Sequence, residues 1–162
     1  MAVISGGVVT GPGRILQQAV LFTETAGAGT YTGSVTVPGG AFLLEVIVHG
    51  VALWDNAGAV DMIVGDSQAV TGDPDGIFII TSLKSGGDLN ATQSISAAGG
   101  TNTASGEPGA DIAATAWERR YHALERIVTG VITTASTGGS AGRTLMIVYY
   151  TDPTTTGAAT KA

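Results

Sequence analysis

The chain has 162 residues, of which 12% are charged, and a formal net charge of −6; its length suits one domain that buries roughly 70% of its unfolded surface. It contains no cysteine, which excludes a disulfide framework, a thiolate zinc site and a cysteine nucleophile. The negative charge argues against nucleic-acid binding, because phosphates are neutralised by clustered Lys and Arg.

The N-terminal residues 1–13 alternate small apolar residues with glycine and end in the breaker cluster Gly11-Pro12-Gly13. We expect an extended arm there. Arg14 is the first positive charge, and no apolar run has the length of a secretory signal or a membrane span, so neither is expected. A single β-sandwich domain is expected over residues 14–152, followed by a flexible tail at 153–162.

Strand patterns recur along this domain, separated by glycine-rich or proline-rich turns. The expected strands are residues 14–24, 30–37, 42–54, 60–64, 77–83, 126–134 and 143–151. The turn Pro38-Gly39-Gly40 predicts that the second and third strands pair, and the loop at 135–142 predicts a closing hairpin. Strands spaced by about 8–12 residues without crossover helices favour an all-β antiparallel sandwich, with a jelly roll as one form.

The stretch at residues 42–54 is the most apolar of these strands. Apolar residues occupy both parities, with Leu44, Val46 and Val48 on one face and Leu43, Ile47 and Val51 on the other. Both faces are therefore expected to be covered. A second sheet would cover one face, and a neighbouring subunit or the long loop described next would cover the other.

Residues 84–116 are rich in Ser, Gly, Ala, Thr and Asn and interrupt the strand pattern as a long loop excursion. Two interpretations remain open: the loop becomes ordered against a neighbour, or it contains a strand at 93–97. After it, Trp117, Tyr121 and Leu124 have helical spacing, which predicts a short helix or an irregular lead-in before the next strand.

The polar residues predict no catalytic site. His49 and Glu45 share one strand face, but four residues of strand span roughly 13 Å, so they cannot form a dyad. His122 has no ligand-like spacing either. The chain lacks a G-x-S-x-G motif and a phosphate-binding loop. We therefore expect no enzymatic activity and no cofactor.

The loop that contains Asp66, Asp73 and Asp75 is the strongest candidate for a metal, because Ca²⁺ is bound by carboxylates from short loops. The spacing does not match an EF-hand, however, and Asp73-Pro74-Asp75-Gly76 is also an ordinary turn sequence. We favour the turn and expect no metal.

Acidic residues predominate between residues 55 and 111, where Lys84 is the only basic residue, and arginines follow later in the chain. This asymmetry indicates either complementary faces in an oligomer or a solvated surface.

Three segments resemble one class of protein in the sequences of their strands and turns: VTVPGGAFLLEVIVHGVALWDNAGAVDMIVGD at 35–66, DPDGIFI at 73–79, and RIVTGVITTASTGGSAGRTLMIVYY at 126–150. The chain resembles the small virion structural proteins of tailed bacteriophages, of the kind that decorate or cement capsids. The resemblance spans roughly residues 33–151 and implies a β-sandwich with a structural role. It carries no catalytic residues.

We therefore expect a phage virion protein, assembled in the host cytoplasm, that decorates or cements the capsid shell as a homo-oligomer, with a trimer favoured. Its partners would be the major capsid protein or other virion proteins, with no nucleic acid and no membrane. Residues 1–13 and 84–116 are the candidate contact segments.

Two alternatives remain open. One is a tail, baseplate or fibre subunit, which the same domain would suit. The other is a carbohydrate-binding module that uses Trp54 or Trp117 with the Asp-rich loop.

Overall fold

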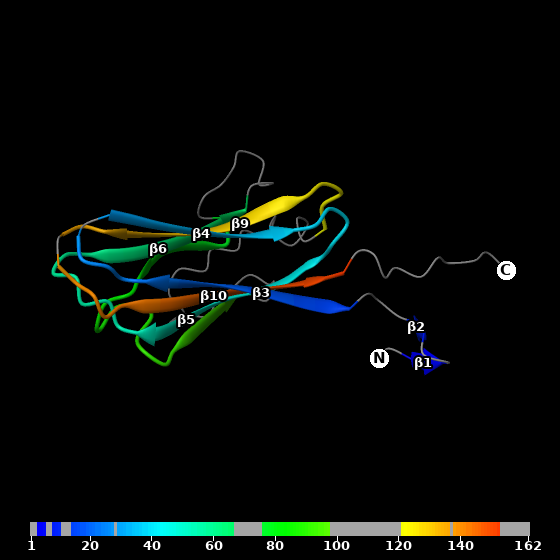
Figure 1. Cartoon of the computed structure of the whole chain (residues 1–162), viewed down its shortest axis with the longest axis horizontal. Coiled ribbons are helices and arrows are strands. Elements are labelled where there is room, and N and C mark those ends of the chain that lie inside the picture. The colour runs from blue at the N-terminus through cyan, green and yellow to red at the C-terminus, as the bar shows by residue number, and fades with distance from the viewer. Residues whose placement is uncertain are drawn as a thin grey trace.

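The fold is described from a computed structural model, which defines residues 3–5, 8–10, 14–27, 29–66, 76–97, 121–136 and 138–152. Two four-stranded antiparallel sheets lie one above the other as the two layers of a sandwich (Figure 1). The prediction of an all-β antiparallel sandwich is confirmed. Among the described residues, none forms a helix with the length and hydropathy that crossing a membrane requires.

Each sheet joins strands that are distant in sequence. One sheet has the order β3 (Ile15–Thr23), β10 (Arg143–Thr151), β5 (Leu43–Ala52) and β8 (Ser94–Ala97). The other has the order β4 (Gly29–Val37), β9 (Arg126–Thr134), β6 (Val60–Asp66) and β7 (Phe78–Ser82). Within the stretch predicted as an arm, β1 (Val3–Ser5) and β2 (Val8–Thr10) pair as a separate small sheet; an arm remains a prediction.

The chain changes sheet at every connection from β3 to β10 except the one between β6 and β7. Two predicted pairings are therefore wrong: β4 pairs with β9 rather than β5, and β9 and β10 do not form a closing hairpin. Local alternation and turn residues specify where a strand begins and ends. They do not specify whether the following strand returns to the same layer or crosses to the other.

The core lies between the two sheets, where alternate residues of each strand point inward. Its fully buried side chains include Val48, Met62, Ile132 and Met146. Gly130 in the middle of β9 is required by this packing, because a Cβ there would lie 2.9 Å from the Met62 methyl carbon and 3.1 Å from the Met146 sulfur. A glycine in a central strand thus gives room for two methionines.

Strand β5 is covered on one face rather than two. Val46 and Val48 are fully buried against the second sheet, whereas Ile47 and His49 on the outer side are half-buried and Val51 is 43% exposed. A register shift against β10 places Leu43 on the core side, out of step with the predicted alternation. The second cover predicted for this strand is not supplied by the described part of the chain.

The segment at 84–116 contains a strand, since β8 occupies Ser94–Ala97 and pairs with β5. This confirms the strand interpretation, while residues 98–120, including Trp117, lie outside the described residues. Tyr121 forms an isolated bridge with Phe42, and their rings lie 5.0 Å apart. Residues 121–125 are not helical, so an irregular lead-in precedes β9. The predicted tail at 153–162 also lies outside the described residues.

Met146 and Ile147 are adjacent on β10 but face opposite sides of the sheet, with Met146 fully buried and Ile147 half-buried. Met146→Ala should lower the free energy of unfolding by about 2–5 kcal/mol, because it leaves a cavity between the sheets. In the isolated protein, Ile147→Ala should lower the free energy of unfolding by clearly less. Urea denaturation of both variants tests the assignment, and equal losses would show that the inner face is misidentified.

Candidate functional site

The candidate catalytic residues of β5 contact a neighbouring strand. His49 Nδ1 lies 2.8 Å from the Ser94 hydroxyl, and Glu45 accepts a hydrogen bond from the Ser96 hydroxyl. Both contacts follow from the register of β5 with β8, which places His49 opposite Ser94. The two side chains therefore join an edge strand to the sheet.

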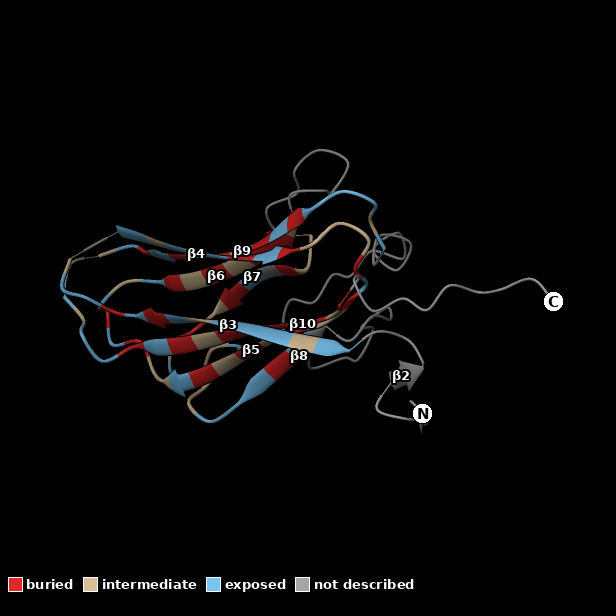
Figure 2. Cartoon of the chain, turned by 45° about the vertical axis from the view of Figure 1, so that its right-hand side comes forward, coloured by how far each residue is buried: buried red, intermediate tan, exposed pale blue. Residues whose placement is uncertain are grey.

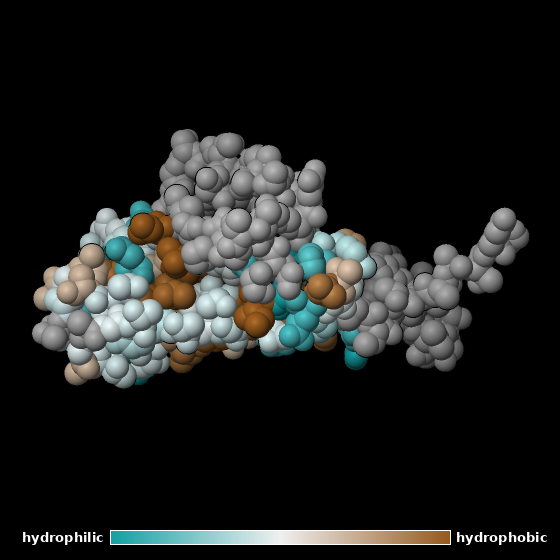
Figure 3. Space-filling view, turned by 90° about the horizontal axis from the view of Figure 1, so that it is seen from above, coloured by the Kyte–Doolittle hydropathy of each residue, from teal (hydrophilic) through white to brown (hydrophobic). Residues whose placement is uncertain are grey.

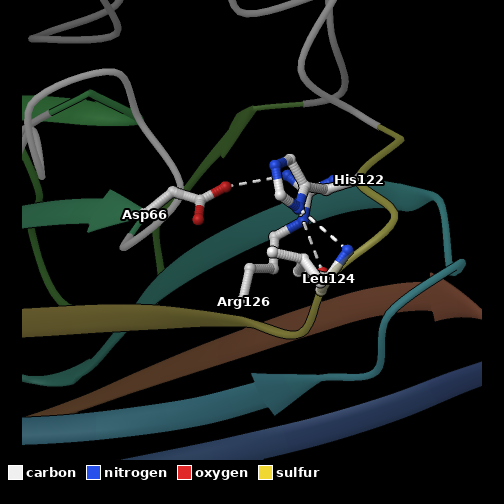
Figure 4. Close-up of polar contacts among 4 residues, drawn as sticks. All are labelled: Asp66, His122, Leu124 and Arg126. Atoms are coloured by element: carbon white, nitrogen blue, oxygen red, sulfur yellow. Dashed lines mark hydrogen bonds and ion pairs between the residues drawn. The ribbon is translucent and has the colours of Figure 1, made fainter.

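Asp66 ends β6 and forms an ion pair with Arg126 at the start of β9, where the Arg126 Nη1 to Asp66 Oδ2 distance is 2.8 Å (Figure 4). The Arg126 side chain is only 2% exposed. Removing one partner from such a buried pair leaves an uncompensated charge. Asp66 thus makes a structural contact, while Asp73 and Asp75 lie outside the described residues. Across the described ranges, no three His, Asp or Glu residues form a potential metal site.

His122 belongs to the lead-in to β9, beside this ion pair (Figure 4). The Leu124 backbone N–H donates to His122 Nδ1 at 3.1 Å. The imidazole thus holds a local turn, which is a structural use of the ring.

Trp54 is a core residue and is 2% exposed. Its Nε1 donates to the Thr144 hydroxyl at 2.9 Å, and its ring meets the Tyr31 ring edge-on with centroids 5.1 Å apart. A sugar-stacking platform needs an exposed aromatic face. The role of Trp54 in the carbohydrate-binding alternative is therefore wrong, and Trp117 lies outside the described residues.

The richest polar cluster is a clip at one end of the sandwich, centred on the buried carboxylate of Glu24 after β3. Its Oε2 accepts from the Gly142 N–H at 2.8 Å and the Asp55 N–H at 3.2 Å, and its Oε1 accepts from the Asn56 N–H at 3.1 Å. Gly142 is required by this packing, because a Cβ there would lie 2.5 Å from the Trp54 ring.

The neighbouring side chains of the β5–β6 loop extend this Glu24 clip. Asp55 Oδ1 accepts from the backbone N–H groups of Ser140 at 2.8 Å and Ala141 at 3.2 Å. These bonds stabilise the carboxylate and lower the pKa of Asp55 below its ordinary value. Asn56 Oδ1 accepts from the Ser136 hydroxyl at 2.7 Å, and the Asn56 carbonyl accepts from the Lys84 ammonium.

The Glu24 clip joins four segments of the chain, and its two carboxylates, those of Glu24 and Asp55, accept hydrogen bonds from backbone N–H groups. Within the described residues, every buried side-chain nitrogen or oxygen has a hydrogen-bond partner. Glu24 was not predicted as a site residue from the sequence, although an acidic residue directly after an uncharged strand could have indicated a buried polar contact.

Both outer faces combine polar and apolar side chains, since the sheet that contains β4 also exposes Ile80 on β7 and Ile127 on β9. The face that contains β4 carries outward Thr30, Thr32, Ser34 and Thr36, which are exposed, and it shows a largely pale surface with separate brown patches (Figure 3). The face that contains β10 carries an apolar band across three strands. The band consists of Leu21, Ile47, Val51, Leu145 and Ile147, where Leu145 lies opposite Leu21, and Ile147 opposite Ile47.

No protein-family profile and no curated protein sequence matches the chain. Its structure is similar to a chain in the capsid of Ralstonia phage GP4, with a TM-score of 0.52 and 18% identity over 98% of this chain and 92% of that one. A chain in the acidic stable capsid structure of Helicobacter pylori bacteriophage KHP30 has a TM-score of 0.44 and 14% identity, over 85% of this chain and 94% of that one. The likeness to the Ralstonia phage chain is one of fold.

Glu24→Gln should destabilise the protein by about 1–3 kcal/mol, because the new amide nitrogen faces backbone donors and leaves one of them unsatisfied. The control is Glu45→Gln, which alters a half-buried side chain bonded to one serine hydroxyl and should change stability much less. Chemical denaturation measures both variants. A Glu24→Gln protein as stable as Glu45→Gln would contradict the structural role of the clip.

Proposed function

We propose that the chain is a structural protein of a tailed-bacteriophage virion, which decorates or cements the capsid shell as a homo-oligomer. The observation that carries the proposal is the fold match to a phage capsid chain over nearly the full length of both chains. The resemblance of three sequence segments to small virion proteins points the same way. We propose no enzymatic activity and no cofactor.

The strand order supports a more specific fold assignment, a jelly roll. Counting from β3, one sheet contains strands 1, 8, 3 and 6 and the other contains strands 2, 7, 4 and 5. Eight antiparallel strands distributed between two sheets in this way form two Greek keys, an arrangement found in viral capsid domains.

The polar groups of the described residues support a structural role. Glu24, Asp55 and Asn56 hold loops together, Asp66 neutralises Arg126, and His49 contacts a serine. Each of these residues therefore has a structural explanation. The residues that remain without such an explanation lie on the surface, and a subunit of an assembly would use surface residues for contacts with its neighbours.

Burial at contacts with other virion proteins is the proposed mechanism. The apolar band on the β10 face would contribute about 25 cal/mol for each Å² that a shell subunit covers. A protein that binds only the assembled shell stabilises it by mass action, without any covalent step. The low charged fraction of 12% limits the desolvation of charges on binding. We propose residues 1–13 and 84–116 as further contact segments and a trimer as the oligomer.

Abundance in the particle separates the capsid role from the tail alternative. Quantitative mass spectrometry of virions purified from the phage that encodes the chain should find many copies, in a fixed ratio to the major shell protein, because shell sites repeat by symmetry. A few copies per particle would instead place the chain in a tail, baseplate or fibre. Its absence from virions would refute the proposed function.

A chain that lacks residues 1–13 should remain folded, because the core residues identified in the described part of the chain all come later in the sequence. It should occupy shells less completely than the full chain at equal concentration, since the deleted contacts no longer contribute to binding. Co-sedimentation with particles lacking the chain measures occupancy, and thermal melting serves as the folding control. Undiminished occupancy would rule out the arm as a contact segment.

A further inference from the structure

The sandwich has two flanks, each formed by one edge strand from each sheet. Strands β3 and β4 are the edges on one flank and contact one another, and β8 and β7 are the edges on the other. An edge strand presents backbone N–H and C=O groups that can pair with another chain, so soluble proteins protect such edges. The two flanks differ in how they are protected.

The β7/β8 flank has the usual protection. Strand β8 has four residues, and β7 has five residues with a register shift against β6. Short strands and irregular register both discourage pairing with another chain.

The β3/β4 flank has neither protection. Both strands have nine residues, and neither Ile15–Thr23 nor Gly29–Val37 contains a charged residue or a proline. Strand β3 is exposed along most of its length (Figure 2). Long, regular and uncharged edges are templates for strand pairing.

The core is also open at this flank. Leu16, Val20 and Tyr31 are only partly buried although they pack against the core cluster, and all three lie on β3 or β4. Gln18 points inward by the alternation of β3 yet remains exposed. Its amide donates to the Tyr150 hydroxyl on the neighbouring strand β10 and, at 3.5 Å, to the Thr36 carbonyl on β4. Apolar side chains would be sealed from water by a strand added at this edge.

The hydrogen bonds that flank the β3–β10 ladder show which backbone groups face outward. The Glu24 N–H donates to the Gly142 carbonyl at 2.8 Å, and the Asp152 N–H donates to the Arg14 carbonyl at 2.7 Å. Hydrogen-bonded pairs alternate along an antiparallel ladder, so the even-numbered residues of β3 bond to β10. The N–H and C=O groups that point to the open edge are those of Ile15, Gln17, Ala19, Leu21 and Thr23.

We infer that the β3/β4 flank is an interface between two copies of this chain, in which β3 pairs antiparallel with β3 of the second copy about a twofold axis near Ala19. Such self-pairing needs no complementary charges, and it keeps residues of equal parity on one face, so the apolar bands of both copies become continuous. The inference does not depend on the proposed function, and it gives the free chain a twofold dimer in place of the trimer proposed there.

The size of the flank is sufficient for a specific pair. Nine residues of strand are about 30 Å long, and two stacked sheets with their side chains are roughly 20 Å thick, which gives about 600 Å² per copy. The total of roughly 1,200 Å² reaches the lower end of specific interfaces.

Two substitutions at Ala19 separate main-chain pairing from side-chain contact. Ala19→Pro removes an outward N–H without breaking the ladder to β10, and proline is tolerated on edge strands. Ala19→Val alters the same exposed site but keeps the N–H. Analytical ultracentrifugation of the full chain should find a wild-type dimer, a Val variant that dimerises comparably, and a Pro variant whose dimer dissociation constant rises at least tenfold. Thermal melting checks that the variants fold.

A monomeric wild-type protein at all accessible concentrations would overturn the inference, as would a folded Ala19→Pro protein that dimerises like the wild type. If the Pro variant does not fold, amide exchange of the wild type measured by NMR decides. In the dimer, the N–H groups of Gln17, Ala19 and Leu21 exchange slowly. Dilution dissociates the dimer and raises their exchange rates. Fast exchange of these three groups at high concentration would also overturn it.

Discussion

The fold depends on pairing strands that are far apart in sequence. Strand β10 lies between β3 and β5, and β9 lies between β4 and β6, so the last two strands of the sandwich complete both sheets. Until those strands have paired, each sheet lacks one of its two central strands. Loop closure must precede most of the stabilising contacts, which is the reason such topologies fold slowly. The Glu24 clip is the local counterpart of this constraint, because it joins the end of β3 to the loops that precede β6 and β10.

The positions of the strands could be predicted from the sequence, and their partners could not. Strands β9 and β10 match their predicted bounds, because alternation and flanking turn residues are local signals. The pairing of β4 with β5 was wrong because the turn at Pro38-Gly39-Gly40 carries the chain to the other sheet. Leu43 was assigned to the wrong face because a bulge is not visible in a parity count.

The same distinction applies to the candidate site. The individual residues His49 and Asp66 were readily selected by type, but their partners Ser94 and Arg126 come from distant segments that only the folded chain brings near. Glu24 was missed since its three donors come from two separate loops. The outer face of β5 was expected to be covered, and it is half-exposed because the described part of the chain supplies only one covering sheet.

Together these features describe a domain whose interior makes its own contacts and whose surface still presents groups that a partner could contact. The buried polar groups of the described residues are satisfied, while an apolar band and two long uncharged edges remain open to partners. Leu21 belongs to both surfaces, because its side chain is 56% exposed on the band and its backbone faces the edge. In the proposed virion role, contacts in the assembled particle would cover both at once.

Hydrogen–deuterium exchange of the chain, compared between isolated protein diluted until its dimers dissociate and purified virions, tests this claim most directly. The account predicts that amides of β3 exchange much more slowly in the virion while the core strands β6 and β9 change little. Equal exchange of β3 in both states would contradict the claim that assembly completes this surface.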